Sequence, residues 1–543
     1  MTESKKTPAR PTLKAVRGTR DLLPDQTPLW NHVEATARAL FARYGFGEIR
    51  TPIFETTELF ARGVGEETDI VSKEMFTFPD GGRADISFLQ VTWQLKHQDV
   101  DDFGQSEPLN HSPMKWQWVQ IDGVRTYVEF QVLLKEKPDW DIKERAKTLR
   151  SRELRYLLVV PIWTHDGIDV VEYEALGIEL ETLPGRFMTS IQQLTLRPEN
   201  TAGVVRAYIE HKLGETGQLQ KLYYIGPQFR RERPQRGRYR QFWQIGAEVI
   251  GPQSSGSESP LRDAEILEML ASFLDELGIR DWRLELNSVG SSEDRVRYNA
   301  ALREALQPIK HQLCEDNQRR ADTNPLRVLD SKEEADQDLI NALPKIADYL
   351  GPESKAHFDQ VLAALDACEV PYNLNPRLVR GLDYYTRTTF EFTVTTGLGT
   401  QNALLGGGRY DGLSEMLGGP KAPGIGFAIG EDRLILTLQA QAEADNISTA
   451  PAKLDAYLAP LTPAQNPAAL ALARELRTAG LTVEVGDGTF KLRKSFDIAD
   501  TLARHIILLG EDEVSTNILT VKTFATGDQT KVPRAELSKH LSS

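Results

Sequence analysis

Arginines are concentrated in one short part of the chain. Six of them lie in the eleven residues from Arg230 to Arg240, within "FRRERPQRGRYRQFWQIGAEVIG", which contains no lysine. The planar fork of arginine matches two phosphate oxygens at once and stays charged when it loses water. The stretch is therefore interpreted as a phosphate-binding loop, with a solvated basic turn as the alternative.

The residues after the arginines alternate as in a β-strand that begins at Gln241. One face would carry an aromatic ring, an amide, a glycine and an acid, from Phe242, Gln244, Gly246 and Glu248. The other face would belong to the core, with Trp243, Ile245, Ala247 and Val249. Glu248 has no opposite charge near it in the sequence. The polar face suits a small polar ligand lying against the sheet, and a half-exposed strand is the alternative.

Later segments add groups of the same kind. "LVRGLDYYTRTTFEF" supplies Arg380 and the pair Tyr384 and Tyr385, whose hydroxyl groups can bind a polar ligand or simply end a hydrophobic core. "LLGGGRYDGL" and "APGIGFAIGEDRL" are rich in glycine, so their backbone can approach a ligand closely, although three glycines in a row could equally form a bulged turn. Arg433 lies in the first turn of a predicted helix, where the helix dipole favours anions.

Two other kinds of site are excluded by spacing. The chain has no G-x-x-x-x-G-K-[ST] phosphate loop. Its nine histidines show neither the H-x-x-x-H nor the H-x-x-E-H spacing of zinc enzymes. We therefore predict no metal-binding residues.

Length and composition describe an ordinary globular protein with a net charge of −14. A chain of 543 residues is expected to form about two to four domains. The pI near 5.3 argues against indiscriminate nucleic-acid binding but leaves room for local basic patches. No stretch reaches the about 18 apolar residues of a membrane span, and two cysteines cannot form a disulfide framework. We therefore expect a cytoplasmic protein without membrane contact.

Periodicity predicts the elements that carry these segments. Pro28 to Gly45 predicts an amphipathic helix, and "GEIRTPIFE" predicts a strand. Leu261 to Leu277 predicts a second helix, followed by mostly helical chain to about Glu369. "TTFEFTVTT" predicts a strand, and "APGIGFAIGEDRLILTLQAQA" a strand that leads into a helix. Beyond 444–454, interpreted as a linker, alternating strands and helices predict a small α/β domain.

The segment 83–190 differs in character from its flanks. Two strand–turn–strand patterns, turning at Asp122-Gly123 and Asp166-Gly167, surround a charged helix predicted for "DWDIKERAKTLRSREL". The pattern predicts a compact inserted module of the type β-β-α-β-β. Because it interrupts another fold, its two ends should lie close together at the surface.

Seven segments, in their order along the chain, resemble the signature of the histidyl-tRNA synthetases, a family of class II aminoacyl-tRNA synthetases. They are "VRGTRDLLP", "EIRTPIFE", "LTLRPENTAG", "FRRERPQRGRYRQFWQIGAE", "LVRGLDYYTRT", "GGGRYDGL" and "GIGFAIGEDRL". "RGLDYYTRT" is specific to the histidyl group, whereas "LRPENTAG" alone would not be. The resemblance covers about residues 13–82 and 190–541.

The resemblance implies an α+β fold. A catalytic domain built on the antiparallel sheet of class II synthetases would span 13–443, after a disordered tail at 1–12. It would be interrupted by the β-rich module at 83–190, which departs from the family pattern, and by a mostly helical insertion at about 285–372. The α/β domain at 455–543 would bind the tRNA anticodon.

The resemblance also implies an activity. The carboxylate of histidine would attack the α-phosphate of ATP, giving histidyl-adenylate and pyrophosphate, and histidine tRNA would then take the histidyl group. Mg²⁺ would accompany ATP, no prosthetic group is expected, and pairing through "EIRTPIFE" would make a homodimer. One alternative is a catalytically inactive paralogue that acts as the histidine-sensing regulatory subunit of ATP phosphoribosyltransferase. Another is an RNA-sensing module descended from a synthetase.

By the same resemblance, the site residues divide into sets. Arg230 and Arg380 would be catalytic and hold the α-phosphate from opposite sides. ATP would be bound by Arg230, Glu232, Arg238, Phe242 and Arg433. Histidine would be bound by Glu199, Thr201, Gln244, Glu248, Tyr384, Tyr385 and Tyr410. Gln235 and Arg240 would lie near the tRNA acceptor end.

Overall fold

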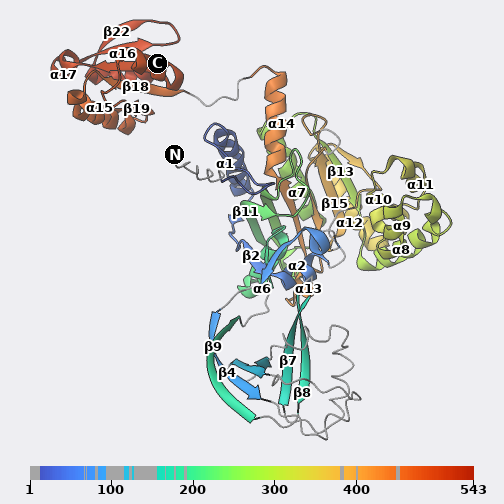
Figure 1. Ribbon diagram of the computed structural model, residues 1–543. Helices are drawn as coiled ribbons and strands as arrows, with labels where there is room; N and C mark the ends of the chain where they lie inside the picture. Colours follow the sequence, from blue (N-terminus) through green and yellow to red (C-terminus); the bar gives the residue numbers. More distant parts are fainter. Residues whose placement is uncertain are drawn as a thin grey trace, which may run out of the picture. The chain divides into compact units, whose positions relative to one another are not determined.

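The computed structural model describes two compact units of the chain (Figure 1). The larger unit includes Val33–Gln441, and the smaller unit comprises Leu22–His32 and Ala442–Ser543. The described residues are 13–65, 68, 70–79, 193–379, 384–398, 402–447 and 453–542, together with the backbone of six strands between 83 and 188. In the described residues, no helix is both long and apolar enough to cross a lipid bilayer.

An eight-stranded sheet forms the centre of the larger unit, with the order β1-β11-β12-β17-β16-β15-β13-β14. Its strands are β1 (Gly47–Glu48), β11 (Gln220–Phe229), β12 (Gln241–Ile250), β17 (Gly424–Gly430), β16 (Ala403–Arg409), β15 (Thr386–Thr393), β13 (Arg283–Ser288) and β14 (Tyr372–Leu374). Every pair from β11 to β13 is antiparallel, and only the two edge strands pair in parallel. The sheet is therefore the antiparallel one that the sequence predicts.

Helices α1 (Thr27–Arg43) and α7 (Pro260–Glu276) contribute to the core on one face of this sheet. The ring of Phe41 from α1 lies 5.2 Å from that of Tyr223 and 6.0 Å from that of Phe427, which both pair with Ala247 of β12. Phe273 of α7 joins the same cluster. The predicted core face of β12 is therefore confirmed for Ile245, Ala247 and Val249, which are completely buried there, whereas Trp243 at the start of the strand is only partly buried.

The predicted strand "GEIRTPIFE" is wrong as one element. The structure divides it into β1 and β2 (Phe54–Thr56), which belong to different sheets. Pro52 lies between them, and proline has no N–H group for a sheet hydrogen bond. Strand β2 pairs with β10 (Gln193–Leu196), which also pairs with β3 (Phe76–Pro79).

The segment between β3 and β10 contains a six-stranded sheet with the order β8-β7-β6-β5-β4-β9. Its strands are β4 (Arg83–Thr92), β5 (Lys115–Ile121), β6 (Arg125–Tyr127), β7 (Tyr156–Thr164), β8 (Gly167–Ala175) and β9 (Glu179–Met188). The two predicted hairpins correspond to β5–β6 and β7–β8, whereas the long pair β4–β9 was not predicted. The predicted charged helix, the turn Asp122-Gly123 and Asp166 lie outside the described residues. Because β3 and β10 pair with each other, the segment leaves and re-enters the larger unit at adjacent points.

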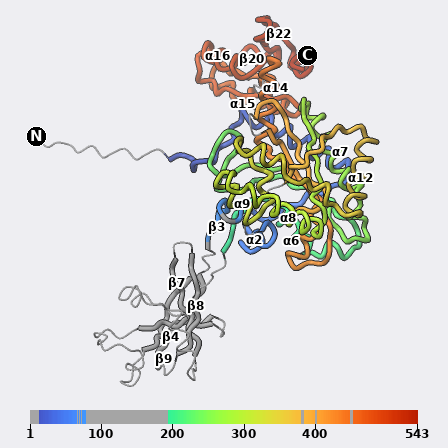
Figure 2. Tube along the Cα trace, turned by 90° about the vertical axis from the view of Figure 1, so that its right-hand side faces the viewer, coloured from blue at the N-terminus to red at the C-terminus, as the bar shows by residue number. Residues whose placement is uncertain are grey.

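The predicted helical insertion begins later than expected. Residues 285–288 belong to β13, a strand of the main sheet, and Tyr372 begins β14. Between these strands lie α8 (Ser292–Leu306), α9 (Glu315–Thr323), α10 (Leu326–Leu329), α11 (Gln337–Asn341) and α12 (Pro352–Ala367). Several of these helices share a small hydrophobic core that includes Tyr298, Leu302 and Val328. The tube in Figure 2 follows the chain through this region.

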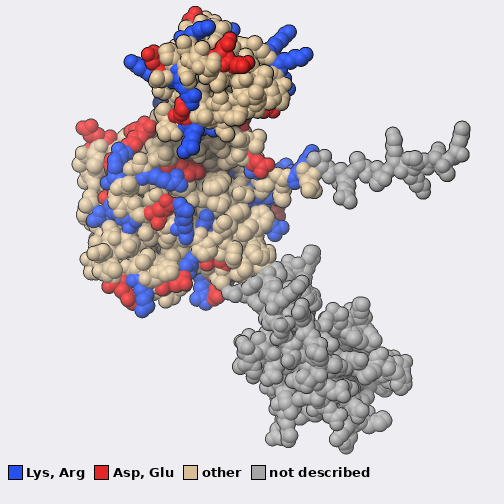
Figure 3. All heavy atoms as spheres, turned by 90° about the vertical axis from the view of Figure 1, so that its left-hand side faces the viewer, with Lys and Arg blue, Asp and Glu red and all other residues tan. Residues whose placement is uncertain are grey.

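The smaller unit is an α/β sandwich with the strand order β19-β18-β20-β21-β22. Its strands are β18 (Leu454–Pro460), β19 (Val483–Val485), β20 (Ala503–Leu509), β21 (Ile518–Thr523) and β22 (Gln529–Pro533). Its helices are α15 (Asn466–Thr478), α16 (Leu492–Leu502), α17 (Glu511–Thr516) and α18 (Leu537–Ser542). The visible face of this unit carries basic and acidic side chains interspersed (Figure 3).

Candidate active site

The carboxyl group of Glu248 lies at the centre of a buried polar cluster near the end of β12. Its side chain is completely buried, and its two oxygens accept hydrogen bonds from the hydroxyls of Thr201 at 2.7 Å and Tyr410 at 2.6 Å. Glu248 therefore has two partners, which the sequence did not reveal. Burial raises the pKa of Glu248 to about 8, even though both hydroxyl groups act to lower it.

Glu199 occupies the start of α6 (Thr201–Glu210). Its carboxylate accepts the backbone N–H groups of Thr201 at 2.7 Å and of Ala202 at 3.1 Å. An acid at this end of a helix satisfies free N–H groups and meets a favourable dipole. Burial nevertheless raises the pKa of Glu199. Two buried carboxyl groups with raised pKa values thus lie on either side of Thr201.

Three tyrosine rings complete the wall of this cluster. Tyr384 lies 4.8 Å from Tyr385 and 5.9 Å from Tyr410 between ring centroids, and all three are buried. The structure therefore brings together six of the seven residues predicted to bind histidine in one cluster. Gln244 lies on the same face of β12 as Glu248, and its buried Oε1 has no hydrogen-bond partner among the described residues.

Glycines on the neighbouring strands make room for these side chains. A Cβ atom at Gly426 would lie 1.6 Å from Oε2 of Glu248, and one at Gly424 would lie 2.4 Å from the Tyr410 ring. A Cβ atom at Gly408 would likewise lie 2.7 Å from the ring of Tyr385. The three glycines at 406–408 do not form a turn, because they pair within β16, although the pairing of β15 with β16 shifts register between Gly408 and Arg409.

The arginine loop connects β11 to β12 and is closed at both ends by backbone hydrogen bonds. Arg230 N–H donates to Arg240 C=O at 2.9 Å, and the tip is a tight turn between Gln235 and Arg238. Gly237 has φ +74°, the left-handed conformation that favours glycine. Gln235 and Arg240, the residues predicted near the tRNA acceptor end, are thus positioned by this folded loop.

The predicted ATP-binding residues of this loop lie together. Nε of Arg230 donates to the carbonyl of Pro198 at 2.9 Å, and its guanidinium lies 5.3 Å from the centroid of the Phe242 ring. Glu232 lies between two arginines, 3.7 Å from Arg230 and 3.3 Å from Arg238. These contacts hold a cation, an acid and an aromatic face in one fixed arrangement.

Arg433 comes from α14 (Glu431–Ala444), in the first helical turn as predicted. Its Nη1 donates to the carbonyl of Ala403. A Cβ atom at Gly237 would lie 3.7 Å from Cγ of Arg433, so the tip of the arginine loop packs next to this helix. The predicted catalytic Arg380 lies outside the described residues.

Sequence reasoning missed the buried ion-pair network that supports the cluster. Arg409 is completely buried, and its guanidinium donates to Asp263 and, at 3.0 Å, to Asp411. Burial acts to raise the pKa of Asp263, but the charges and hydrogen bonds of Arg409 and His357 together outweigh it and lower the pKa to about 2. Asp411 also accepts from the hydroxyl of Thr386 at 3.1 Å. The network therefore joins the end of β16, next to Tyr410, to the start of β15, near Tyr384.

Tyr224 of β11 was missed as well. It is buried beneath Gly246, where a Cβ atom would lie 2.4 Å from the tyrosine hydroxyl oxygen. Burial, with a smaller contribution from Glu248, raises the pKa of Tyr224 well above its ordinary value. In the sequence only its position opposite a glycine of β12 could have distinguished it from an ordinary core tyrosine.

Comparison with known proteins identifies the family. The family description "Histidyl-tRNA synthetase" matches residues 186–434, and "Anticodon binding domain" matches residues 455–543. A histidine–tRNA ligase of Koribacter versatilis (strain Ellin345) is 52% identical over 530 residues, covering 97% of this chain and 96% of the relative. The chain belongs to the histidyl-tRNA synthetase family.

Other relatives agree with this membership of the histidyl-tRNA synthetase family. A histidine–tRNA ligase of Solibacter usitatus (strain Ellin6076) is 41% identical, covering 97% of this chain and 99% of the relative. The crystal structure of apo S. aureus histidyl-tRNA synthetase matches with a TM-score of 0.64 at 30% identity, covering 98% of this chain and 100% of that one. The alignments cover nearly all of this chain and of both ligases. Both ligases are therefore long enough to contain a segment of similar size to 83–190.

Proposed function

We propose that this chain activates L-histidine with ATP to form histidyl-adenylate and then transfers the histidyl group to histidine tRNA. Its membership of the family makes it a histidine–tRNA ligase that uses ATP. The observation that carries the two-step mechanism is the buried carboxyl group of Glu248 at one end of β12, with the arginine loop at the other end. The alternative of a regulatory paralogue lacks support, because the relatives aligned over nearly the whole chain are ligases.

Glu248 is suited to bind the imidazole ring of histidine. A ligand N–H group pointing at its carboxyl group would favour the ionised form that burial disfavours. An amino acid without such a group would leave the buried carboxyl group of Glu248 without its ligand hydrogen bond, and a site built for such a bond can discriminate by about 10⁴-fold. We assign Tyr385 to the imidazole ring as well, and Tyr384 and Tyr410 to the pocket walls.

The remaining polar groups are suited to the α-amino group of histidine. Oε1 of Gln244, which has no partner among the described residues, and the Glu199 carboxylate are acceptors that could bind an ammonium group. The hydroxyl of Thr201 donates to Glu248, so we propose that Thr201 orients that carboxyl group while its neighbours face the amino group. This arrangement would aim the substrate carboxylate toward the arginine loop.

The arginine loop would position ATP for in-line attack. A carboxylate oxygen of histidine forms a bond to the α-phosphorus while the bond from that phosphorus to the bridging oxygen breaks and pyrophosphate leaves. Arg230, fixed by Pro198 and Phe242, would neutralise the charge that develops, since a donor positioned in advance needs no reorganisation. Arg380 is proposed to act from the opposite side. Phe242 would stack on adenine.

The other ATP contacts follow from the same arrangement. Glu232 and Arg238, held together by an ion pair, would fix the nucleotide, and Arg433 would meet the γ-phosphate with the help of the α14 dipole. Mg²⁺ is proposed to arrive with the phosphates of ATP. No three acidic, histidine or cysteine side chains of the described residues are placed to hold a metal ion by themselves.

The tRNA would contact both units. The 455–543 domain is proposed to bind the anticodon, and Gln235 and Arg240 to lie near the acceptor end. We further propose the division into a catalytic domain at 13–443, with insertions at 83–190 and about 289–371, and a linker at 444–454. A cytoplasmic homodimer is the proposed working form.

Amino-acid-dependent ATP–pyrophosphate exchange, measured with all the standard amino acids, tests the proposed function. We expect exchange with histidine alone. The exchange rate of Arg380→Ala should fall by at least about 100-fold, because removing one preorganised charge from a transition state typically slows a reaction by that factor. Arg319→Ala, an exposed arginine of α9, is the matched control and should keep wild-type exchange. Histidine binding without exchange in the wild-type protein would refute the adenylate mechanism.

A further inference from the structure

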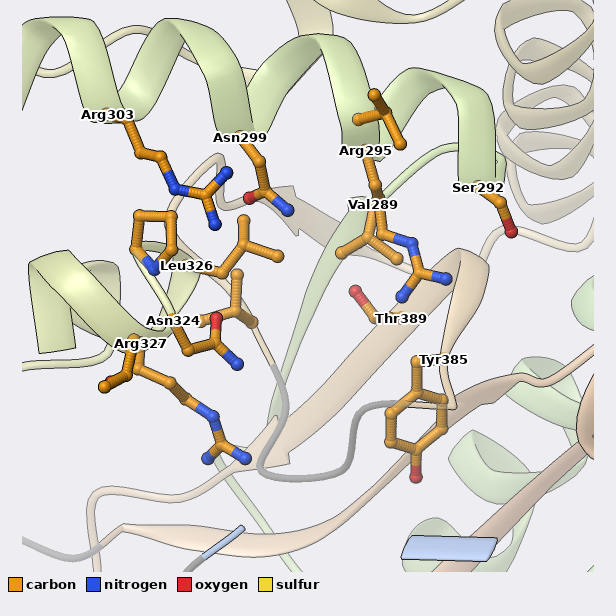
Figure 4. Close-up of a pocket in the computed structure, with 14 residues that line it drawn as sticks. Val289, Ser292, Arg295, Asn299, Arg303, Asn324, Leu326, Arg327, Tyr385 and Thr389 are labelled. Carbon is orange, nitrogen blue, oxygen red and sulfur yellow. The ribbon is translucent and has the colours of Figure 1, made fainter. Parts of the chain in front are cut away.

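A pocket lined by arginines lies between α8, the 323–327 segment and β15 (Figure 4). Its volume is about 400 Å³. It shares Tyr385 with the Glu248 cluster, but none of the predicted ATP-binding residues lines it. Its lining consists of Val289, Ser292, Arg295, Val296, Asn299, Arg303, Thr323, Asn324, Pro325, Leu326, Arg327, Val379, Tyr385 and Thr389.

The lining of this pocket is entirely neutral or basic. It contains three arginines and no aspartate or glutamate, in a chain whose net charge is −14. Arg295 and Arg303 are eight residues apart on α8, so they project from one side of that helix, and Arg327 comes from α10 (Figure 4). Arg303 forms no ion pair with any residue that the structure describes, so its charge is available to a ligand.

Two buried polar atoms in the lining also lack partners within the described part of the chain. They are the hydroxyl of Thr389, a completely buried residue of β15, and Oδ1 of Asn299, which lies between the two arginines on α8. A buried polar group without a partner is costly, and binding an ion, a water molecule or a ligand is one way to satisfy it. The Thr389 hydroxyl can donate to an anion that the arginines attract.

We propose that this pocket is a second phosphate-binding site, separate from the ATP-facing arginines of the β11–β12 loop. The arginine fork matches phosphate oxygens, and the volume exceeds what a single inorganic phosphate needs, so a larger phosphate-bearing ligand fits. The shared Tyr385 places that ligand next to the proposed histidine pocket. This assignment rests on the proposed function. The phosphate would come either from the tRNA backbone or from free pyrophosphate.

Charge changes at Arg303 in the full-length chain test the proposal. Arg303 is exposed on α8, so Arg303→Ala and Arg303→Glu should fold, which the melting temperature checks. The matched control is Arg319→Ala, an exposed arginine outside the pocket. Each variant is assayed for binding of a histidine tRNA transcript at several salt concentrations and for histidine-dependent ATP–pyrophosphate exchange. Pyrophosphate is also titrated with the ATP site filled by a non-hydrolysable ATP analogue.

If the phosphate belongs to tRNA, Arg303→Glu should raise the Kd for tRNA about tenfold. Arg303→Ala should reduce by about one the slope of the logarithm of the binding constant against the logarithm of the salt concentration. Exchange should stay at the wild-type rate. If the ligand is free pyrophosphate, it should still raise the wild-type melting temperature beside the bound ATP analogue, but not that of Arg303→Glu. Unchanged tRNA affinity together with equal pyrophosphate responses would overturn the proposal. A wild-type protein without exchange would instead contradict the proposed function, and the binding assays would still be interpretable.

Discussion

The carboxyl group of Glu248 behaves unlike a glutamate in water because of where β12 places it. Burial removes the water that would stabilise its charge, and neighbouring Glu199 adds a further unfavourable charge. The hydroxyl groups of Thr201 and Tyr410 compensate only in part. At neutral pH and without a ligand, the folded protein therefore keeps Glu248 mostly protonated, and histidine binding would have to change that state.

A comparison of Glu248→Gln with wild type should reveal this proton. The pKa of Glu248 is about 8 in the folded protein and about 4.5 in the unfolded chain. The stabilisation of the fold by the bound proton is therefore fully present below about pH 4.5. It is lost as the pH rises from about 4.5 to about 8. The wild-type free energy of unfolding should therefore fall relative to that of the variant by up to about 1.4 kcal/mol per pH unit. Urea titrations from pH 5 to 8 measure the difference.

The control for this experiment is the same chemical change at an exposed position. Glu58→Gln on α2 (Thr57–Val64), where the glutamate side chain is 65% exposed, should follow the wild-type pH profile. Parallel profiles for wild type and Glu248→Gln would mean that Glu248 is ionised in the folded protein. The proposed change of protonation on histidine binding would then be wrong.

At the scale of elements, the glycines of β16 and β17 are explained by the side chains that cover them. Glu248, Tyr410 and Tyr385 each lie against a glycine where no Cβ atom could fit. The sequence indicated close backbone approach, but to a ligand. In the structure the approaching groups belong to the protein itself, and they define the pocket wall.

Two alanine substitutions on the same strand test this role of the glycines. Gly426→Ala would place a methyl group 1.6 Å from Oε2 of Glu248, so we expect a loss of stability of about 3 kcal/mol or more. A Cβ atom at Gly430 would meet only Arg433, at 3.9 Å, among the residues that the structure describes, so Gly430→Ala should stay within about 0.5 kcal/mol of wild type. Urea unfolding measures both values. Equal stabilities would mean that the strand adjusts easily and that Glu248 is not rigidly positioned.

Elements with a local pattern were predictable, and contacts across long sequence distances were not. The core face of β12 and helix α7 follow from alternation and helical periodicity. The contact of Glu248 with Tyr410 joins residues 162 positions apart, and only a family resemblance placed them in one pocket. The network of Arg409, Asp263 and Asp411 was invisible, because a buried charged residue looks like a surface residue in a sequence.

At the scale of the whole molecule, the small sheet β2-β10-β3 has an unusual surface. Phe54 and Phe78 are 53% and 40% exposed. They pair with Leu196 and Leu194 of β10, so both rings point to the same face of the sheet. Ile53, 45% exposed, precedes Phe54 in the segment "EIRTPIFE". Grouped exposed aromatic side chains of this kind are typical of a surface that a partner chain covers.

The homodimer proposed from the same segment can therefore be tested at Phe54. By light scattering at micromolar concentration, the wild-type protein should have about twice the chain mass of 60.9 kDa. Phe54→Glu should shift the mass toward the single chain, because a charge in the apolar contact would lose its water without gaining a partner. Leu470→Glu, at a position 60% exposed on α15, introduces the same charge elsewhere and should leave the dimer intact. A wild-type protein that is monomeric at this concentration would refute the dimer, and the apolar face of this small sheet would then need another partner.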